Sequence, residues 1–253
     1  MNEITYIHVL KSLLLVIVAL AVSRFWKVRT EKDMVVGTVR SFVQLLAVGY
    51  ALKYIFQSDL LIINALVILV MITIAGHTAS TRVHHLRHSF SLCIIALAVG
   101  AISTLASLMI INPDWTTARY IIPLGGMITS NAMNAATLSM SRLVSDIRNN
   151  RLAIETSLSL GKSWHTATKN YRREATVTGM ITILNFMKTV GLVALPGAMT
   201  GMILGGAEPL EAVLLQLVVG YMLLAATTVT SVVAVQLTVR RFFTSYHQLI
   251  IED

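Results

Sequence analysis

Seven stretches of mostly apolar residues alternate with shorter polar connections along this chain. A helix needs about 20 apolar residues to cross a bilayer, and each stretch comes close to that length. We therefore predict an all-α fold, a polytopic membrane helix bundle that forms a single domain over residues 1–253. The predicted spans are residues 6–23, 35–56, 60–76, 90–111, 120–143, 176–196 and 210–238.

Composition supports this reading of the pattern. Hydrophobic residues make up 55% of the chain and charged residues 13%, and the mean hydropathy is +0.73, which is far from soluble usage. The net charge of +8 would suggest nucleic acid in a soluble protein. Here it marks one membrane face, so we expect membrane lipid around the chain and no nucleic acid partner.

Charge alternates between the connections and predicts an orientation. Basic residues are concentrated in residues 24–34, 77–89 and 145–175 and in the tail after residue 238, whereas the other connections hold little beyond Lys53 and Arg119. By the positive-inside rule the basic connections are cytoplasmic. This predicts an N-terminus outside, a C-terminus inside, and a multi-pass protein of the cell inner (plasma) membrane.

The longest polar connection, residues 146–175, has the pattern helix, Gly, helix. Gly161 suits the left-handed position that ends a helix, and Ser163 can cap the next one. The spacing from Glu155 to Gly161 resembles the "EAA" coupling loop of ABC importer permeases, which contacts an ATPase subunit. The residues expected to couple to that subunit are Glu155, Leu158, Leu160, Gly161 and Ser163.

Polar residues inside the predicted spans are candidates for a transport pathway or gate, because polar groups rarely face lipid. Some of these residues also have a purely structural interpretation. Arg40 can snorkel to the headgroups, and the amides of the fifth span can bond between helices. Lys188 can pair with Glu208 or Glu211. The candidates for pathway or gate are Arg40, Gln44, Met127, Asn131, Asn134, Lys188 and Gln216.

A glycine-rich segment follows the sixth span. Its glycines recur every four residues, so in a helix they form a smooth ridge that allows close packing. The alternatives are tight packing at an outer re-entrant turn, or a gate or subunit contact. The hinge or packing candidates are Pro196, Gly197, Gly201 and Gly205.

The sequence contains two groups of possible metal ligands, a histidine cluster and the methionines, but neither predicts a metal site. His77, His84, His85 and His88 lie close together in sequence, but no Cys or carboxylate accompanies them, so they are read mainly as a solvated loop. The 12 methionines are read mainly as apolar filler. Whether either group binds metal stays open.

Motifs that are absent narrow the function. The sequence has no Gly-x-x-x-x-Gly-Lys-Ser/Thr phosphate loop, and no Ser-His-Asp or His-Glu-x-x-His arrangement. We expect a transport subunit rather than an enzyme, with no cofactor bound by this chain and ATP held by a partner subunit.

Several longer segments are similar to the FetB-type family of ABC transporter permeases. They are residues 188–201, 205–216, 126–133, 158–161 and 40–45, and the resemblance covers essentially the whole chain. It implies a permease subunit that pairs with an ATP-binding ABC subunit, with two copies of each in the complex. Bacterial members are assigned to "probable iron export" and plant relatives to aluminium tolerance. The chain departs from the family pattern at Thr182, Asn185 and Ala198, which bears on metal specificity and leaves the architecture unchanged.

Three function classes follow from these features. The first is an ABC permease that exports iron or another metal ion with energy from a separate ATPase. The second is a gradient-driven secondary transporter or channel, which needs no ATPase and gives the 146–175 segment no task. The third, an intramembrane enzyme or scaffold, is disfavoured by the lack of paired catalytic groups.

Overall fold

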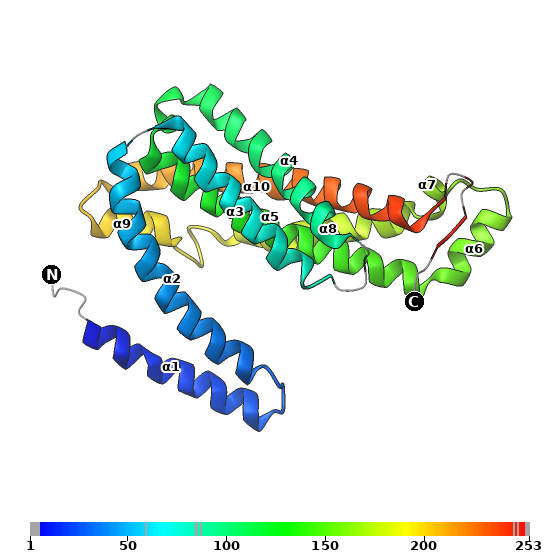
Figure 1. Cartoon of the computed structure of the whole chain (residues 1–253), viewed down its shortest axis with the longest axis horizontal. Helices are drawn as coiled ribbons and strands as arrows, with labels where there is room; N and C mark the ends of the chain where they lie inside the picture. The colour runs from blue at the N-terminus through cyan, green and yellow to red at the C-terminus, as the bar shows by residue number, and fades with distance from the viewer. Residues whose placement is uncertain are drawn as a thin grey trace. The chain divides into compact units, whose positions relative to one another are not determined.

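The computed structural model describes residues 6–58, 60–83, 86, 88–244, 246 and 248–250, which are almost entirely helical. Apart from helices, the described residues form two isolated β-bridges, so the all-helical prediction is confirmed there. Each predicted span overlaps a helix of at least 20 residues (Figure 1). These are α1 (Tyr6–Phe25), α2 (Glu31–Ser58), α3 (Leu61–Ser80), α4 (Ser89–Ile111), α5 (Ala118–Asn149), α8 (Lys169–Thr189) and α10 (Pro209–Val239). The shorter elements are η1 (Pro113–Thr116), α6 (Arg151–Ser159), α7 (Trp164–Ala167), α9 (Gly197–Leu204) and η2 (Arg240–Phe242).

Four helical stretches in the described residues are long and apolar enough to cross a membrane. They are Glu31–Gln57, Leu61–Ser80, Ser89–Ile111 and Pro209–Phe242. α5 and α8 do not reach this level, because polar and small residues are frequent on both helices.

The chain forms two compact units, residues 1–58 and 59–253. In the first, α1 and α2 form an antiparallel hairpin (Figure 1). The turn between them is tight: Lys27 and Arg29 adopt positive φ angles of 53° and 64°. The buried Ser23 hydroxyl lies 3.2 Å from Thr30 Oγ1 and donates to Glu31 Oε1 at 3.2 Å. These side-chain bonds compensate for a backbone conformation that residues other than glycine rarely adopt.

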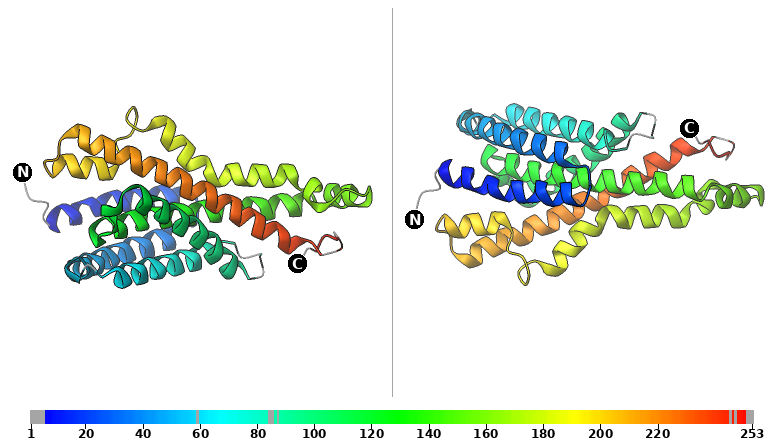
Figure 2. Two further views of the ribbon diagram at one scale, coloured as in Figure 1. Left: turned by 90° about the horizontal axis from the view of Figure 1, so that it is seen from above. Right: turned by 90° about the horizontal axis from the view of Figure 1, so that it is seen from below.

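The second unit is a bundle in which α5 and α10 form the centre. α10 packs against α4, α5, α8 and α9, and α5 also packs against α3, α4 and α8. In each view of the bundle, α9 lies at one end and α6 and α7 lie at the other (Figures 1 and 2). The long helices therefore connect two ends that carry different segments.

Close packing in this bundle depends on glycines that face neighbouring helices. At Gly179 of α8, an added Cβ would lie 2.8 Å from the Ala135 carbonyl oxygen of α5 and would clash with Ser231 Oγ of α10. At Gly100 of α4, it would clash with Thr230 Oγ1 of α10. Both glycines allow backbones to approach, as small residues do between membrane helices.

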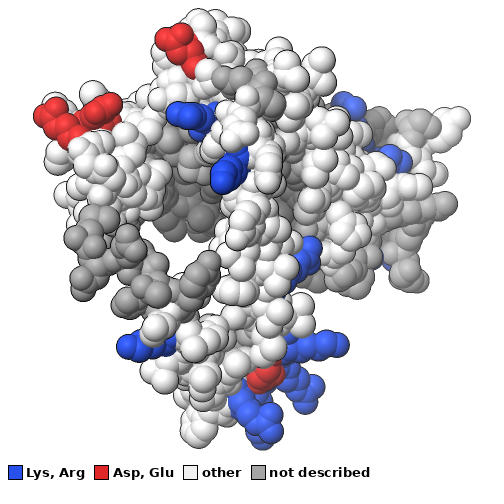
Figure 3. Space-filling model, turned by 60° about the vertical axis from the view of Figure 1, so that its left-hand side comes forward, with Lys and Arg blue, Asp and Glu red and all other residues white. Residues whose placement is uncertain are grey.

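Charged residues make up only 13% of the chain. On the face drawn in Figure 3 they stand in small groups on a mostly uncharged surface. The single cysteine, Cys93, is fully buried, and its Sγ lies 3.6 Å from Met140 Sδ. A mostly uncharged face suits a lipid environment.

Candidate functional site

The polar segment at one end of the bundle turns sharply at Gly161, which has a φ of +81°. Gly161 N–H donates to the Leu158 carbonyl at 2.9 Å, and Lys162 N–H donates to the Ser157 carbonyl at 3.1 Å. This pair of bonds is the Schellman arrangement that ends a helix with a left-handed residue. The sequence-predicted helix end at Gly161 is therefore present.

Ser163 occupies the position directly before α7, with extended φ and ψ angles of −67° and 154°. Its side chain does not bond to the α7 backbone; its Oγ lies 3.2 Å from Thr166 Oγ1 instead. The position of the cap was predicted correctly, whereas the expected side-chain bond is not formed.

Two large apolar side chains, one on α6 and one directly after it, are exposed. Ile154 is buried, but Leu152 is 78% exposed and Leu160 is 74% exposed. Glu155 is half-buried and pairs with Arg151 at 2.8 Å, one turn away on the same helix. Leu158 is half-buried. The tip thus combines a stabilised short helix with two large apolar side chains that are open to a partner.

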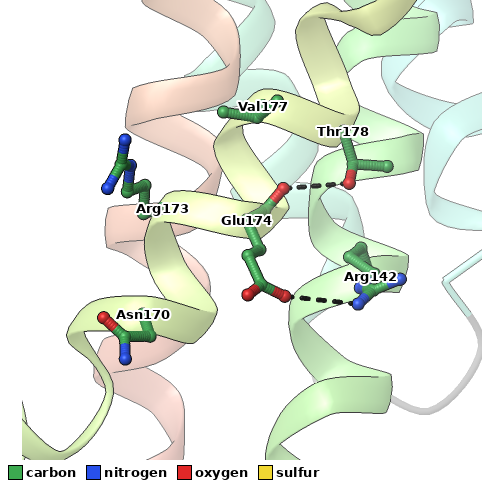
Figure 4. A pocket seen from close by; sticks show the side chains of 6 residues that line it. All are labelled: Arg142, Asn170, Arg173, Glu174, Val177 and Thr178. Carbon is green, nitrogen blue, oxygen red and sulfur yellow. Dashed lines mark hydrogen bonds and ion pairs between the residues drawn. The ribbon is translucent and has the colours of Figure 1, made fainter.

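A polar pocket lies between α5 and α8, close to this tip (Figure 4). It has a volume of about 510 Å³. Glu174 of α8 points toward Arg142 of α5, whose Nη2 lies 3.4 Å from Glu174 Oε2. Arg142 Nε also donates to Asp146 at 2.8 Å. The pair joins α5 to α8 where the polar segment departs from both helices, and the sequence reading did not identify it.

The predicted pathway residues on α5 lie on its outer face. Asn134 is exposed, and Met127 and Asn131 are half-buried. Asn131 Nδ2 donates to the Met127 carbonyl at 2.9 Å, so its bond is within its own helix rather than between helices. Ser130 and Arg142 continue this face, and both are exposed. A polar face on a long central helix is therefore open.

Gln216 of α10 is 93% buried, since its exposed fraction is 7%. Its Oε1 has no hydrogen-bond partner among the described residues. It lines a pocket of about 240 Å³ between α8, α9 and α10, with Met187, Met199 and Gly220 among the other lining residues. A buried amide oxygen without a donor is costly, and it can accept a hydrogen bond from a molecule in this pocket.

Lys188 lies in the last turn of α8, which ends at Thr189. It is exposed, and in the described part of the chain it forms no ion pair with Glu208 or Glu211. The helix of the predicted sixth span, residues 176–196, therefore ends early: Gly191 has a φ of +83°, and the next helix, α9, begins at Gly197. Lys188 is thus at a helix end rather than in mid-span.

α9 carries the predicted glycine ridge, which begins directly after Pro196. An added Cβ at Gly197 or Gly201 would meet no atom within 4 Å, and at Gly205 it would meet only carbonyls of its own helix. Among the described residues, these three glycines therefore pack against no other helix. Glycines that do pack against another helix, among them Gly100 and Gly179, lie elsewhere, and the four-residue spacing did not reveal them.

Two further groups of predicted residues lie apart from these sites. Arg40 and Gln44 lie on α2 in the first unit, and both are exposed. His84 and His85 fall outside the described residues, and His77 and His88 lie on either side of them. No group of three His, Cys, Asp or Glu side chains that could hold a metal ion is found in the described ranges.

A bundle of long helices, several of them apolar enough to cross a bilayer, with a polar helix–turn–helix at one end, defines a multi-pass membrane protein. The chain belongs to the "Uncharacterised protein family (UPF0014)", whose model matches residues 6–243.

Relatives extend over nearly the whole chain. It is 38% identical to "UPF0014 membrane protein STAR2" of Oryza sativa subsp. japonica, over 92% of this chain and 82% of the relative. It is 37% identical to "Protein ALUMINUM SENSITIVE 3" of Arabidopsis thaliana, over 94% and 87%. It is 35% identical to "Probable iron export permease protein FetB" of Escherichia coli (strain K12), over 99% and 96%. The expected resemblance to the FetB-type family is confirmed. No solved structure matches the chain.

Proposed function

We propose that this chain is the membrane-spanning permease subunit of an ABC transporter in the cell inner membrane, and that it exports a metal ion. Energy comes from ATP bound to a separate subunit. The observation that carries the proposal is the Gly161 turn at the end of the bundle, with Leu152 and Leu160 exposed beside it.

The tip fits the task of docking an ATPase subunit. Large apolar side chains at the centre of an interface commonly supply most of its binding energy. Leu152 and Leu160 are candidates for that role, because each exposes about three quarters of its surface, 78% and 74%. The Arg151–Glu155 pair supports α6 as a helix in the absence of many tertiary contacts.

Seven crossings and a cytoplasmic tip are part of the proposal. The four strongly apolar stretches are long and apolar enough to cross, and in the proposal α1, α5 and α8 complete the set. In this arrangement the basic connections face the cytoplasm, as the positive-inside rule requires, and the tip faces the ATPase.

Two copies of the chain form the pathway. The open face of α5 carries Ser130, Asn131 and Asn134, and such polar groups avoid lipid at membrane depth. A second copy facing the first would enclose this face, with water or substrate between them. Gln216 adds a hydrogen-bond acceptor near the opposite end from the tip.

ATP binding would close the ATPase pair and shift the permease between two arrangements. A ligand can shift such an equilibrium only by as much as it binds one arrangement better. In the proposed complex the tip is the part that differs in its contacts between the two.

Iron or another metal is the proposed cargo. The support is the name of the Escherichia coli relative, "Probable iron export permease protein FetB", and the name "ALUMINUM SENSITIVE 3" of a plant relative. No feature of the described site favours the gradient-driven alternative over the ATP-driven one.

The test is purification of the tagged chain from its native membrane in mild detergent, followed by transport in liposomes. An ATP-binding protein should co-purify, and Leu160→Asp should weaken that association about tenfold or more, because an interface anchor contributes about 2 kcal/mol. Leu192→Asp is the matched control, since Leu192 is 89% exposed but lies at the opposite end. ATP-independent transport by the chain alone would establish the gradient-driven alternative instead.

A further inference from the structure

An aromatic stack fastens the polar tip to the end of α10. The Trp164 ring, at the start of α7, stacks on the Phe243 ring with centroids 5.6 Å apart and planes at 17°. Phe243 directly follows η2, which continues α10. The contact spans nearly 80 positions of sequence, so it is a tertiary link and not a local one.

Arg172 of α8 also contacts Trp164 and joins it to α10. Its guanidinium carbon lies 5.8 Å from the Trp164 ring centroid. Nη1 donates to Gln236 Oε1 of α10 at 3.3 Å, and Nη2 donates to the His165 carbonyl of α7 at 2.9 Å. Burial lowers the pKa of Arg172 from its ordinary value, yet a guanidinium stays charged in proteins. One side chain therefore ties three helices together.

Burial shows that this junction is packed. Thr168, between α7 and α8, is fully buried, and its hydroxyl donates to the Trp164 carbonyl at 2.8 Å. Phe242 and Phe243 are also buried. α7 is thus fixed to α8 and α10, whereas α6 continues beyond the Gly161 turn with its apolar side chains exposed.

We infer that Trp164 and Arg172 are positioning residues that transmit movement of the tip to α10. This inference rests on the proposed function and adds the path by which movement at the tip reaches the rest of the bundle. Force applied at α6 reaches α10 through the Trp164–Phe243 stack, in addition to the path along the chain into α8. α10 then carries it from Gln236 to Gln216, twenty residues along one continuous helix, a distance of about 30 Å. Gln216 lines the pocket at the opposite end.

The experiment uses the whole complex in liposomes and measures iron transported per ATP hydrolysed. Trp164→Ala should lower this ratio about tenfold, which is a usual size for a coupling between sites, while the ATP-binding protein still co-purifies. Trp164→Phe keeps a ring for stacking and should restore most of the ratio. Trp115→Ala is the matched control, because Trp115 also stacks on a ring, that of Tyr120 at 6.0 Å, but at the other end of the bundle. Equal ratios for Trp164→Ala, Trp115→Ala and wild type overturn the inference.

A cross-link tests the same contact by fixing it instead of removing it. The double variant Trp164→Cys with Phe243→Cys lacks both rings, so its transport per ATP should fall as in Trp164→Ala. A short thiol cross-linker that joins the two cysteines should then restore this ratio, because α7 and the end of α10 move together. Cys93 is fully buried and gives little background. A ratio that stays low or falls further on cross-linking, with the complex still assembled, overturns the inference.

A third measurement separates this inference from the proposed function. If no ATP-binding protein co-purifies with the wild type, the proposed function fails, and hydrogen exchange of the chain alone still tests the anchor. Trp164→Ala should then speed exchange of the amides at residues 236–243 compared with Trp115→Ala. Unchanged exchange there shows that the stack does not hold α10.

Discussion

The two ends of the unit formed by residues 59–253 are built in different ways. At the tip, α7 is held by ring stacking, a shared arginine and a buried threonine. At the other end, residues 190–206 contain Gly191 and Gly206 with positive φ angles of 83° and 95°. There, Leu192 and Val193 are 89% and 82% exposed. The first end is fixed by side chains and the second mainly by hydrogen bonds of its own backbone.

This difference indicates a division of tasks. A segment that transmits force needs firm tertiary contacts where it is attached, whereas a segment that opens and closes needs weak local contacts. In the proposed transporter the tip is suited to transmission, and the α9 end is suited to gating.

The largest expected effect comes from proline at the turn of the tip. Gly161→Pro cannot keep a φ of +81°, because proline is fixed near −65°. Transport should be lost while membrane insertion persists, as measured by membrane-fraction blotting together with liposome uptake. Gly206→Pro is the matched control for ATPase stimulation, which it should leave intact, since Gly206 also has a positive φ but lies at the end away from the tip. Survival of both ATPase stimulation and transport in Gly161→Pro would falsify the coupling role.

A smaller effect is expected from alanine at two glycines, one in the bundle interior and one at the α9 end. The two substitutions should change the free energy of unfolding in opposite directions. Gly179→Ala forces a methyl group to within 2.8 Å of the Ala135 carbonyl, and such overpacking costs about 1–3 kcal/mol. Gly201→Ala places its methyl group in open space within a helix and should stabilise by up to about 1 kcal/mol. Thermal unfolding in detergent measures both. A stabilised Gly179→Ala would show that α5, α8 and α10 are less closely packed than described.

The smallest effect is expected at the polar pocket beside the tip. Arg142 and Glu174 are both well exposed, with 48% and 61% of their side chains accessible, and water screens such pairs. Glu174→Gln should lower the unfolding temperature slightly at low salt. The difference should vanish near 1 M salt, where the screening length is about 3 Å. A large effect that persists in salt would mean that the pair is buried in the assembled complex.

Hydrophobic patterning predicted the helices because burial and lipid exposure act on whole stretches of about 20 residues. It also predicted the Gly161 turn, since a glycine after a helical run is a local signal. α5 extends to Asn149, six residues beyond the predicted end at residue 143, because no glycine or proline stops it there. The break after Thr189 was missed since Val190 to Leu195 is an apolar run, and hydropathy does not register backbone direction.

The contacts that position the candidate site were less accessible to sequence. Gly100 and Gly179 allow close packing, yet neither belongs to a regular glycine series. The regular series at residues 197–205 packs against no other helix in the part of the chain that the structure describes. The Trp164–Phe243 stack and the Arg142–Glu174 pair join positions far apart in the chain. Such pairs depend on how the helices pack against one another, and a single sequence does not reveal that packing.

The length of α5 has a geometric consequence. Its 32 residues extend over roughly 48 Å, and the hydrocarbon layer is about 30 Å thick. In the proposed transporter, this single helix can therefore reach from the far side of the bilayer to a point well clear of the near surface. A partner at that point could act on the membrane interior without itself approaching the lipid.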